Sequence, residues 1–152
     1  MIANDVYRHE FKHEWRFEQD TGFIYAVTNG RIELADAVEF IRLFERDVPR
    51  GAAAFMLGDN RRATEMSLAA RRAFASDWKP GEMYIAAFGQ SAVYRIILNM
   101  FLKGLSIIRP NFTAAMFAEE AEAREWLTEK RRAYLARKAR GATTVSNSAS
   151  PP

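Results

Sequence analysis

Residues 52–91, AAAFMLGDNRRATEMSLAARRAFASDWKPGEMYIAAFGQS, decide the fold. Two short apolar runs, 52–57 and 83–88, each end at a polar segment, and residues of helical composition at 67–78 lie between them. Short apolar runs bounded by turn residues are typical of strands that are buried on both faces, as parallel strands are. This stretch therefore predicts a strand, helix and strand unit at the centre of a mainly parallel sheet.

The flanking sequence extends this alternation in both directions. Polar and aromatic residues alternate from Tyr7 to Glu18, which predicts an amphipathic strand, and Phe23–Thr28 predicts its hairpin partner. We expect the remaining helices over 34–48, 92–106 and 119–140, with a last short strand over 113–117. The predicted fold is a single mixed, mainly parallel five-stranded sheet with about four helices, in the order β-β-α-β-α-β-α-β-α, with the N-terminal strand as an antiparallel edge.

Composition limits the protein to one domain and excludes several kinds of chemistry. A chain of 152 residues, 49% of them hydrophobic, can bury one core, and we expect an α/β domain over 1–140 followed by a disordered polar tail, 141–152. The absence of cysteine excludes disulfides and thiolate sites. The charged N-terminal sequence lacks a secretory signal, so we expect a cytoplasmic protein.

The charge pattern argues against nucleic acid and membrane partners. Much of the net charge of +3 comes from the cluster at 129–140, which is too local to form a nucleic-acid footprint. The most apolar stretch, 94–108, is interrupted by Arg95, Asn99 and Lys103, so the sequence predicts no transmembrane segment.

Polar residues follow the two central strands. Ligands of open α/β sheets bind beyond the carboxyl ends of the strands. An Asp beside two guanidinium groups is suited to an anion or a polar head group, while the alternative interpretation is a solvated turn that Asp59 orients. Ser91 is also a good N-cap for the helix that follows. The candidate binding residues are Asp59, Asn60, Arg61, Arg62, Gln90 and Ser91.

The helix predicted at 92–106 is more apolar than one sheet contact requires. Its polar residues form one narrow stripe, and a helix packed on a sheet needs an apolar face of only about 100°. The surplus has three interpretations: additional core, a dimer face, or the wall of an apolar pocket. The candidate pocket or interface residues are Tyr94, Leu98, Phe101, Leu102 and Phe112.

No residue spacing specifies catalysis or a metal. His9 and His13 share one face of the predicted first strand, but no third ligand accompanies them, and an aromatic-lined sheet face is the competing interpretation. No nucleophile is paired with a base, and no GxSxG motif is present. We therefore expect no enzyme activity, no metal and no cofactor.

The order of elements and several short phrases resemble the STAS-like domains. The phrases are VTNGRIELADAVEFIRLFE, FMLGDNRRATEMSLAARRAF, EMYIAAFGQSAVYRIILNMFLKG and NFTAAMFAEEAEAREWL, and the likeness is to the stand-alone bacterial group similar to anti-sigma-factor antagonists. The resemblance implies a role in protein interaction or in binding a small ligand. A more distant likeness to CRAL-TRIO lipid-transfer domains would imply an apolar ligand.

One departure from that pattern concerns regulation. Members switched by phosphorylation carry Asp-Ser or Asp-Thr after the third strand, whereas Asn60 follows Asp59 in this chain, and the nearest hydroxyls are Thr64 and Ser67. No phosphorylation site can therefore be carried over. We expect a non-catalytic regulatory module that binds another protein or itself, and the alternative is a carrier or sensor of a small apolar or lipid-like ligand held between sheet and helices.

Overall fold

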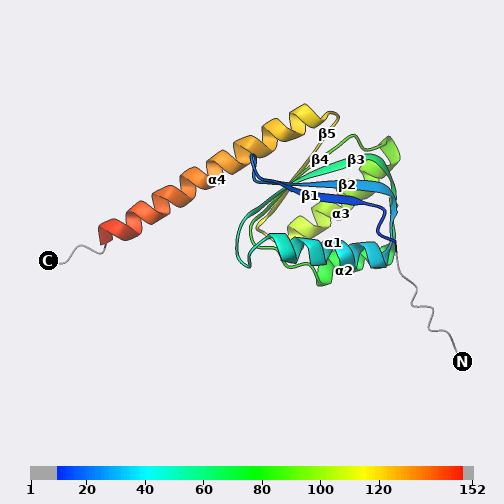
Figure 1. The fold of residues 1–152 in the computed structure, drawn as a ribbon, viewed down its shortest axis with the longest axis horizontal. Helices are drawn as coiled ribbons and strands as arrows, with labels where there is room; N and C mark the ends of the chain where they lie inside the picture. Colours follow the sequence, from blue (N-terminus) through cyan, green and yellow to red (C-terminus); the bar gives the residue numbers. More distant parts are fainter. Residues whose placement is uncertain (1–9, 149–152) are drawn as a thin grey trace, which may run out of the picture.

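The computed structural model describes residues 10–148 and contains one mixed five-stranded sheet. The strands lie in chain order, β1-β2-β3-β4-β5, with β1 antiparallel to β2 and all other pairs parallel (Figure 1). The prediction of a mixed, mainly parallel sheet with an antiparallel N-terminal edge is confirmed. The strands are β1 (Glu14–Glu18), β2 (Phe23–Ile32), β3 (Ala54–Met66), β4 (Met83–Phe88) and β5 (Phe112–Phe117).

Three helices cover one face of the sheet and one helix crosses the other (Figure 1). Crossovers between neighbouring parallel strands are right-handed, so a sheet whose strands follow chain order collects its connecting helices on one face. The fourth helix follows the last strand and covers the opposite face. The helices are α1 (Leu34–Asp47), α2 (Leu68–Ser76), α3 (Ala92–Ile108) and α4 (Glu120–Ser148).

The alternation of side chains along β4 divides the core in two. Met83, Ile85 and Ala87 face the layer of α1, α2 and α3, whereas Tyr84 and Phe88 face α4. All six residues of β4 are buried. The sequence therefore reads as a continuous apolar run, as expected for a strand covered on both sides.

The first strand is shorter than predicted. β1 begins at Glu14 rather than at Tyr7, and residues 7–9 lie outside the described part of the chain. His13 precedes the strand and is buried, with its Nδ1 accepting a hydrogen bond of 2.9 Å from the backbone N–H of Asn29. Its Nε2 lies 3.4 Å from Oδ2 of buried Asp36. These contacts and the neighbouring ring of Phe40 place His13 in the core.

The second and third strands are longer than predicted. Residues 59–62 do not form a polar turn; they continue β3, because β2 also continues to Ile32 and supplies hydrogen-bonding partners as far as Met66. The register shifts twice along this pair, and Val27 and Asn29 lie opposite Asp59 and Arg62. Such a bulge inserts an extra residue into β3 and changes the direction of the side chains around it.

The last helix extends beyond its predicted end at Arg140. α4 continues to Ser148, so residues 141–148, expected to be disordered, are helical, and its second half projects past the sheet (Figure 1). Residues 149–152 lie outside the described part. None of the described helices has the length and apolar character needed to cross a membrane.

Candidate functional site

A row of small residues on three neighbouring strands forms the floor of an apolar cavity. Ala26 of β2 lies opposite Gly58 of β3, which in turn lies opposite Ala87 of β4. All three face the layer of α1, α2 and α3, and all three line the cavity. Because none has a side chain larger than a methyl group, these three residues leave a space between themselves and the helices above them.

The cavity has a volume of about 110 Å³ and lies between the sheet and the three helices. Its walls are aromatic and aliphatic, and the rings of Phe74, Trp78 and Phe101 pack against one another there. We call this space the sheet–helix cavity. Further wall residues are Trp15, Phe40, Phe44, Met56, Ile85, Leu98 and Leu102.

Three polar side chains lie in this otherwise apolar wall. Thr28 of β2 and Asn60 of β3 are each 7% exposed, and Tyr94 of α3 is 1% exposed. The side chains of these three residues make no hydrogen bond to another group of residues 10–148. Burial raises the pKa of the Tyr94 hydroxyl to about 12, so this group remains a neutral hydrogen-bond donor at physiological pH.

Four of the five apolar candidates from the sequence line this cavity. Tyr94, Leu98, Phe101 and Leu102 all lie on the face of α3 that looks towards the sheet. Phe112 is buried in the adjoining core, with its ring centroid 6.2 Å from that of Trp78, and does not line the cavity. The predicted pocket residues therefore converge, apart from Phe112.

The charged candidates lie on the opposite face of the sheet. Asp59 is 5% exposed and accepts hydrogen bonds from Arg61 Nε (3.0 Å) and Nη2 (2.7 Å), from the Arg61 backbone N–H (3.1 Å) and from the Tyr25 hydroxyl (3.1 Å). Burial opposes ionisation of this carboxyl, but the hydrogen bonds from Arg61 and Tyr25 outweigh it and lower its pKa. The carboxylate of Asp59 is therefore ionised and already hydrogen-bonded to Arg61 and Tyr25, which is a structural role.

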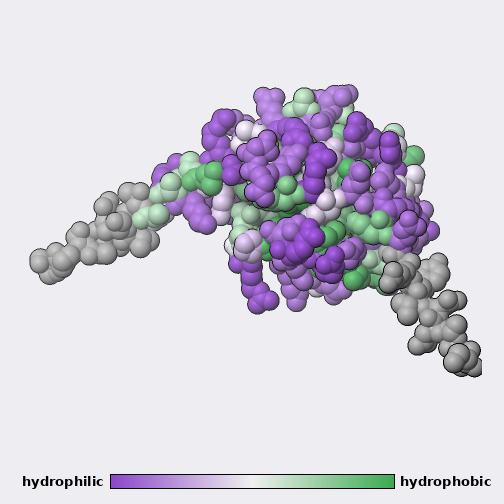
Figure 2. Space-filling view, in the orientation of Figure 1, coloured by the Kyte–Doolittle hydropathy of each residue, from purple (hydrophilic) through white to green (hydrophobic). Residues whose placement is uncertain are grey.

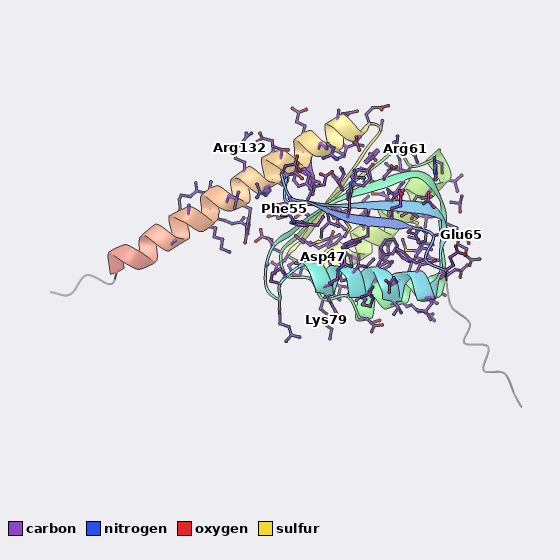
Figure 3. All side chains as sticks on the ribbon, viewed as in Figure 1. Asp47, Phe55, Arg61, Glu65, Lys79 and Arg132 are labelled. Atoms are coloured by element: carbon purple, nitrogen blue, oxygen red, sulfur yellow. The ribbon has the colours of Figure 1, made fainter. Side chains whose placement is uncertain are left out.

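A hollow of about 460 Å³ opens beside this pair, and its charges balance. Glu14, Val27, Asp59, Arg61 and Arg62 line it, so two carboxylates face two guanidinium groups. Figure 3 shows Arg61 on β3 near the start of α4. Asn60 lies between Asp59 and Arg61 in sequence, but its side chain lies on the other face of the sheet and lines the sheet–helix cavity. The strand thus separates Asn60 from its neighbours, and the hollow has no excess of positive charge for an anion.

Gln90 and Ser91 perform local structural tasks. Gln90 Nε2 donates a hydrogen bond of 3.3 Å to the carbonyl of Phe117, which joins the ends of β4 and β5. Ser91 Oγ accepts a hydrogen bond of 3.2 Å from the backbone N–H of Tyr94 and caps α3, as one interpretation of the sequence proposed. This segment does adjoin the Asp59 segment, because the backbone of Gly89 packs directly against the Arg61 side chain.

The sequence interpretation missed the floor of the cavity and one of its polar groups. The sequence predicts a strand end at Thr28 and strand positions for Ala26 and Ala87, and it places Gly58 in a polar loop, whereas the structure places Gly58 inside β3. A signal was present, because a very small residue lies in or directly after each apolar run: Ala26, Gly58 and Ala87. Only the register shows that these residues lie side by side.

The outward side of α3 carries exposed apolar side chains. Val93 is 69% exposed, Ile96 64%, Met100 70% and Ile107 84%. These positions follow helical spacing and form one stripe, which we call the α3 strip. Within residues 10–148, no element covers these four side chains.

Comparison with known proteins identifies the fold. No protein-family model and no curated protein matches the chain. A solved structure of an uncharacterised protein from the DUF3478 family with a SpoIIAA-like fold, from Shewanella loihica PV-4, matches it with a TM-score of 0.55 and 16% sequence identity, over 76% of this chain and 91% of that chain. The chain therefore has the SpoIIAA-like fold, which is the fold of the STAS-like domains and anti-sigma-factor antagonists that its sequence resembles.

Proposed function

We propose that the chain is a non-catalytic protein-interaction module of the STAS type, and that its partner is a second copy of the same chain bound through the α3 strip. The observation that carries this proposal is the exposure of four large apolar side chains along one stripe of α3. Contiguous apolar patches of roughly 300–600 Å² on single chains often mark interaction sites. Water contact along such a stripe is unfavourable, so covering it stabilises an assembly.

The shape of the strip favours pairing with itself. A twofold axis through the middle of α3 would place Val93 of one copy near Ile107 of the other, with Met100 of both copies at the centre. Gly104 lies along the same stripe, and a Cβ atom added there would meet nothing within 4 Å. A small residue at a helix crossing allows two backbones to approach closely.

The two edge strands of the sheet differ in charge, and this difference also favours an interface at the α3 side. The edge strand β1 carries Glu14, Arg16 and Glu18, and the face of the molecule on which it lies is dominated by hydrophilic side chains (Figure 2). Charged residues on an edge strand discourage pairing with another chain. The opposite edge strand, β5, reads FTAAMF and has no charged residue. α3 packs against β5, so the strip and the unprotected edge belong to the same end of the sheet.

Sedimentation equilibrium tests this proposal. We expect the wild-type chain to form dimers at micromolar concentration and Met100→Glu to weaken dimerisation at least about tenfold, because it places a carboxylate at the centre of an apolar interface. Val38→Glu is the matched control, since Val38 is 54% exposed on α1, away from the strip. A wild-type chain that remains monomeric, or an equal loss in the control, would contradict the proposal.

A second candidate function is the binding of a small apolar ligand in the sheet–helix cavity. The observation that favours it is an apolar cavity of about 110 Å³ between the sheet and the helices α1, α2 and α3. Native mass spectrometry of freshly purified protein separates the two candidates, because a bound small molecule adds a discrete mass to the chain, whereas an interaction module alone gives a ligand-free dimer.

A further inference from the structure

We infer that the sheet–helix cavity binds a compact, uncharged amphiphile whose hydrogen-bonding head lies beside Thr28 of β2, Asn60 of β3 and Tyr94 of α3. This inference rests on the second candidate function and adds the chemical class of the ligand and its orientation. It is carried by three buried polar side chains, Thr28, Asn60 and Tyr94, in the lining of a cavity that is otherwise apolar.

The polar groups lie together because of the register. Thr28 lies between Val27 and Asn29, which are opposite Asp59 and Arg62, so it is level with Asn60 across the β2–β3 pair. Tyr94 is in the first turn of α3, which starts directly after the carboxyl end of β4. A hydroxyl and an amide therefore follow the row of small residues along β2 and β3, and the phenol of Tyr94 lines the same cavity from α3.

These groups favour a ligand that supplies hydrogen bonds. A polar group that faces a cavity without a protein partner gains from a hydrogen bond, which contributes about 0.5–1.5 kcal/mol net. The carboxylate of Asp59, by contrast, is buried and accepts hydrogen bonds from Arg61 and Tyr25. A ligand head that bonds to Thr28, Asn60 and Tyr94 would gain that free energy, and a purely apolar ligand would not.

The lining also limits the charge of the ligand. Within residues 10–148, no Asp, Glu, Lys or Arg side chain lines the cavity. Transfer of an ionised carboxylate or phosphate into such a site without a counter-charge is strongly unfavourable. The head is therefore an alcohol, phenol, amide or carbonyl rather than an ion.

The volume limits the size of the ligand. Engineered apolar cavities of about 150 Å³ in other proteins bind benzene. At about 110 Å³, the sheet–helix cavity suits a ring or short chain of similar size with one polar substituent. Suitable probes are therefore benzyl alcohol, toluene and benzoate, which share a ring and differ in the head.

Calorimetric titration with these probes tests two statements separately: that the cavity binds small molecules, and that it prefers an uncharged polar head. Toluene tests whether the cavity binds apolar molecules at all, and we expect both toluene and benzyl alcohol to bind. We expect benzoate to bind at least about tenfold more weakly than benzyl alcohol at pH 7, because its charge has no partner in the cavity.

Variants assign the binding to the cavity and to its polar side chains. Tyr94→Phe and Thr28→Val each remove a hydroxyl at nearly constant shape, so each should weaken benzyl alcohol binding about threefold to tenfold and leave toluene binding within about twofold. Tyr134→Phe, on the α4 side of the sheet, is the matched control and should change neither. Gly58→Val adds a side chain at the cavity floor, where the nearest atom to a Cβ is 3.9 Å away, and should abolish binding of both probes.

Each result has a distinct meaning. If toluene binds but benzyl alcohol binds no better in the wild type than in Tyr94→Phe and Thr28→Val, the polar head is refuted while ligand binding stands. Benzoate binding as tightly as benzyl alcohol also refutes the uncharged head. If no probe binds, or if Gly58→Val leaves binding unchanged, the cavity is not a ligand site and both statements fail.

Discussion

Gly58 lines the cavity and also lies inside strand β3, so a substitution there affects both the cavity and the stability of the sheet. Its backbone does not require glycine, since it lacks the positive φ found at Gly22, Gly30, Gly51 and Gly89. A Cβ there would make only ordinary van der Waals contacts, the nearest at 3.9 Å. Glycine inside a strand has a higher entropic cost of folding than alanine and packs nothing.

We therefore expect Gly58→Ala to stabilise the protein by about 0.5–1 kcal/mol, measured by urea denaturation. The contrasting variant is Gly89→Ala, at φ +75°, where the new methyl group would collide with Cγ of Arg61. That change should destabilise the protein by about 1–3 kcal/mol. A loss of stability in Gly58→Ala would mean that the floor of the cavity cannot accept additional atoms.

Glu18 gives stability a specific dependence on pH. Arg124 donates hydrogen bonds of 2.8 and 2.9 Å to its two oxygens and, with a smaller contribution from Thr21, lowers the pKa of Glu18 from 4.5 to about 2. A carboxyl whose pKa is lower in the folded state stabilises that state above its unfolded pKa. The contribution is lost as pH falls from about 4.5 to about 2.

We expect Glu18→Gln to be less stable than the wild type by about 1 kcal/mol at pH 7, and the difference to vanish near pH 2. Denaturation series at several pH values measure this difference. Glu129→Gln, which removes an exposed pair with Arg132, should show almost no difference at any pH. A Glu18→Gln effect that is constant with pH would show that the ion pair is not its source.

At the scale of the element, β3 shows what can be predicted from sequence and what cannot. Its first half is an apolar run, and the sequence identified it correctly. Its second half contains Asp59, Arg61 and Arg62, whose composition is that of a turn. Those residues remain in the strand because β2 continues alongside them, and pairing between distant segments is not encoded in local composition.

The same strand explains why the residues of the predicted polar site lie on two different faces of the sheet. Consecutive residues of a strand point to opposite faces, so a run of four polar residues cannot form one site. Asp59 and Arg61 face the side of α4, whereas Asn60 faces the cavity. The helices were easier to predict, because α1 and α3 have caps and periodicity within their own sequences.

The start of α3 supplies a prediction for that element. Ser91 Oγ accepts the N–H of Tyr94, and loss of such an N-cap costs about 1 kcal/mol. We expect Ser91→Ala to destabilise the protein by about that amount and to increase amide hydrogen exchange in the first turn of α3. Ser91→Asp keeps a capping oxygen and should restore protection. Unchanged exchange in Ser91→Ala would show that packing alone fixes the start of the helix.

At the scale of the whole molecule, the core on the α1, α2 and α3 side of the sheet borders the sheet–helix cavity, and the core beneath α4 does not. Leu127 of α4 is 0% exposed in the core beneath α4, while Leu98 of α3 is 7% exposed and borders the cavity. A side chain beside a void has fewer contacts to lose on truncation. We therefore expect Leu127→Ala to cost about 3–5 kcal/mol and Leu98→Ala about 2–3 kcal/mol, both measured by urea denaturation. Equal costs would mean that the cavity closes around the truncated side chain.

The order of the strands also has a consequence for synthesis on the ribosome. Strands and crossover helices that follow one another in chain order can associate as they emerge, and domains generally fold from the N-terminal end during translation. Within residues 10–148, the side of the sheet that holds Phe55, Leu57 and Phe88 is covered only by α4, which follows all the strands in the chain. A nascent chain ending before residue 120 would thus expose this apolar surface to chaperones until α4 is synthesised.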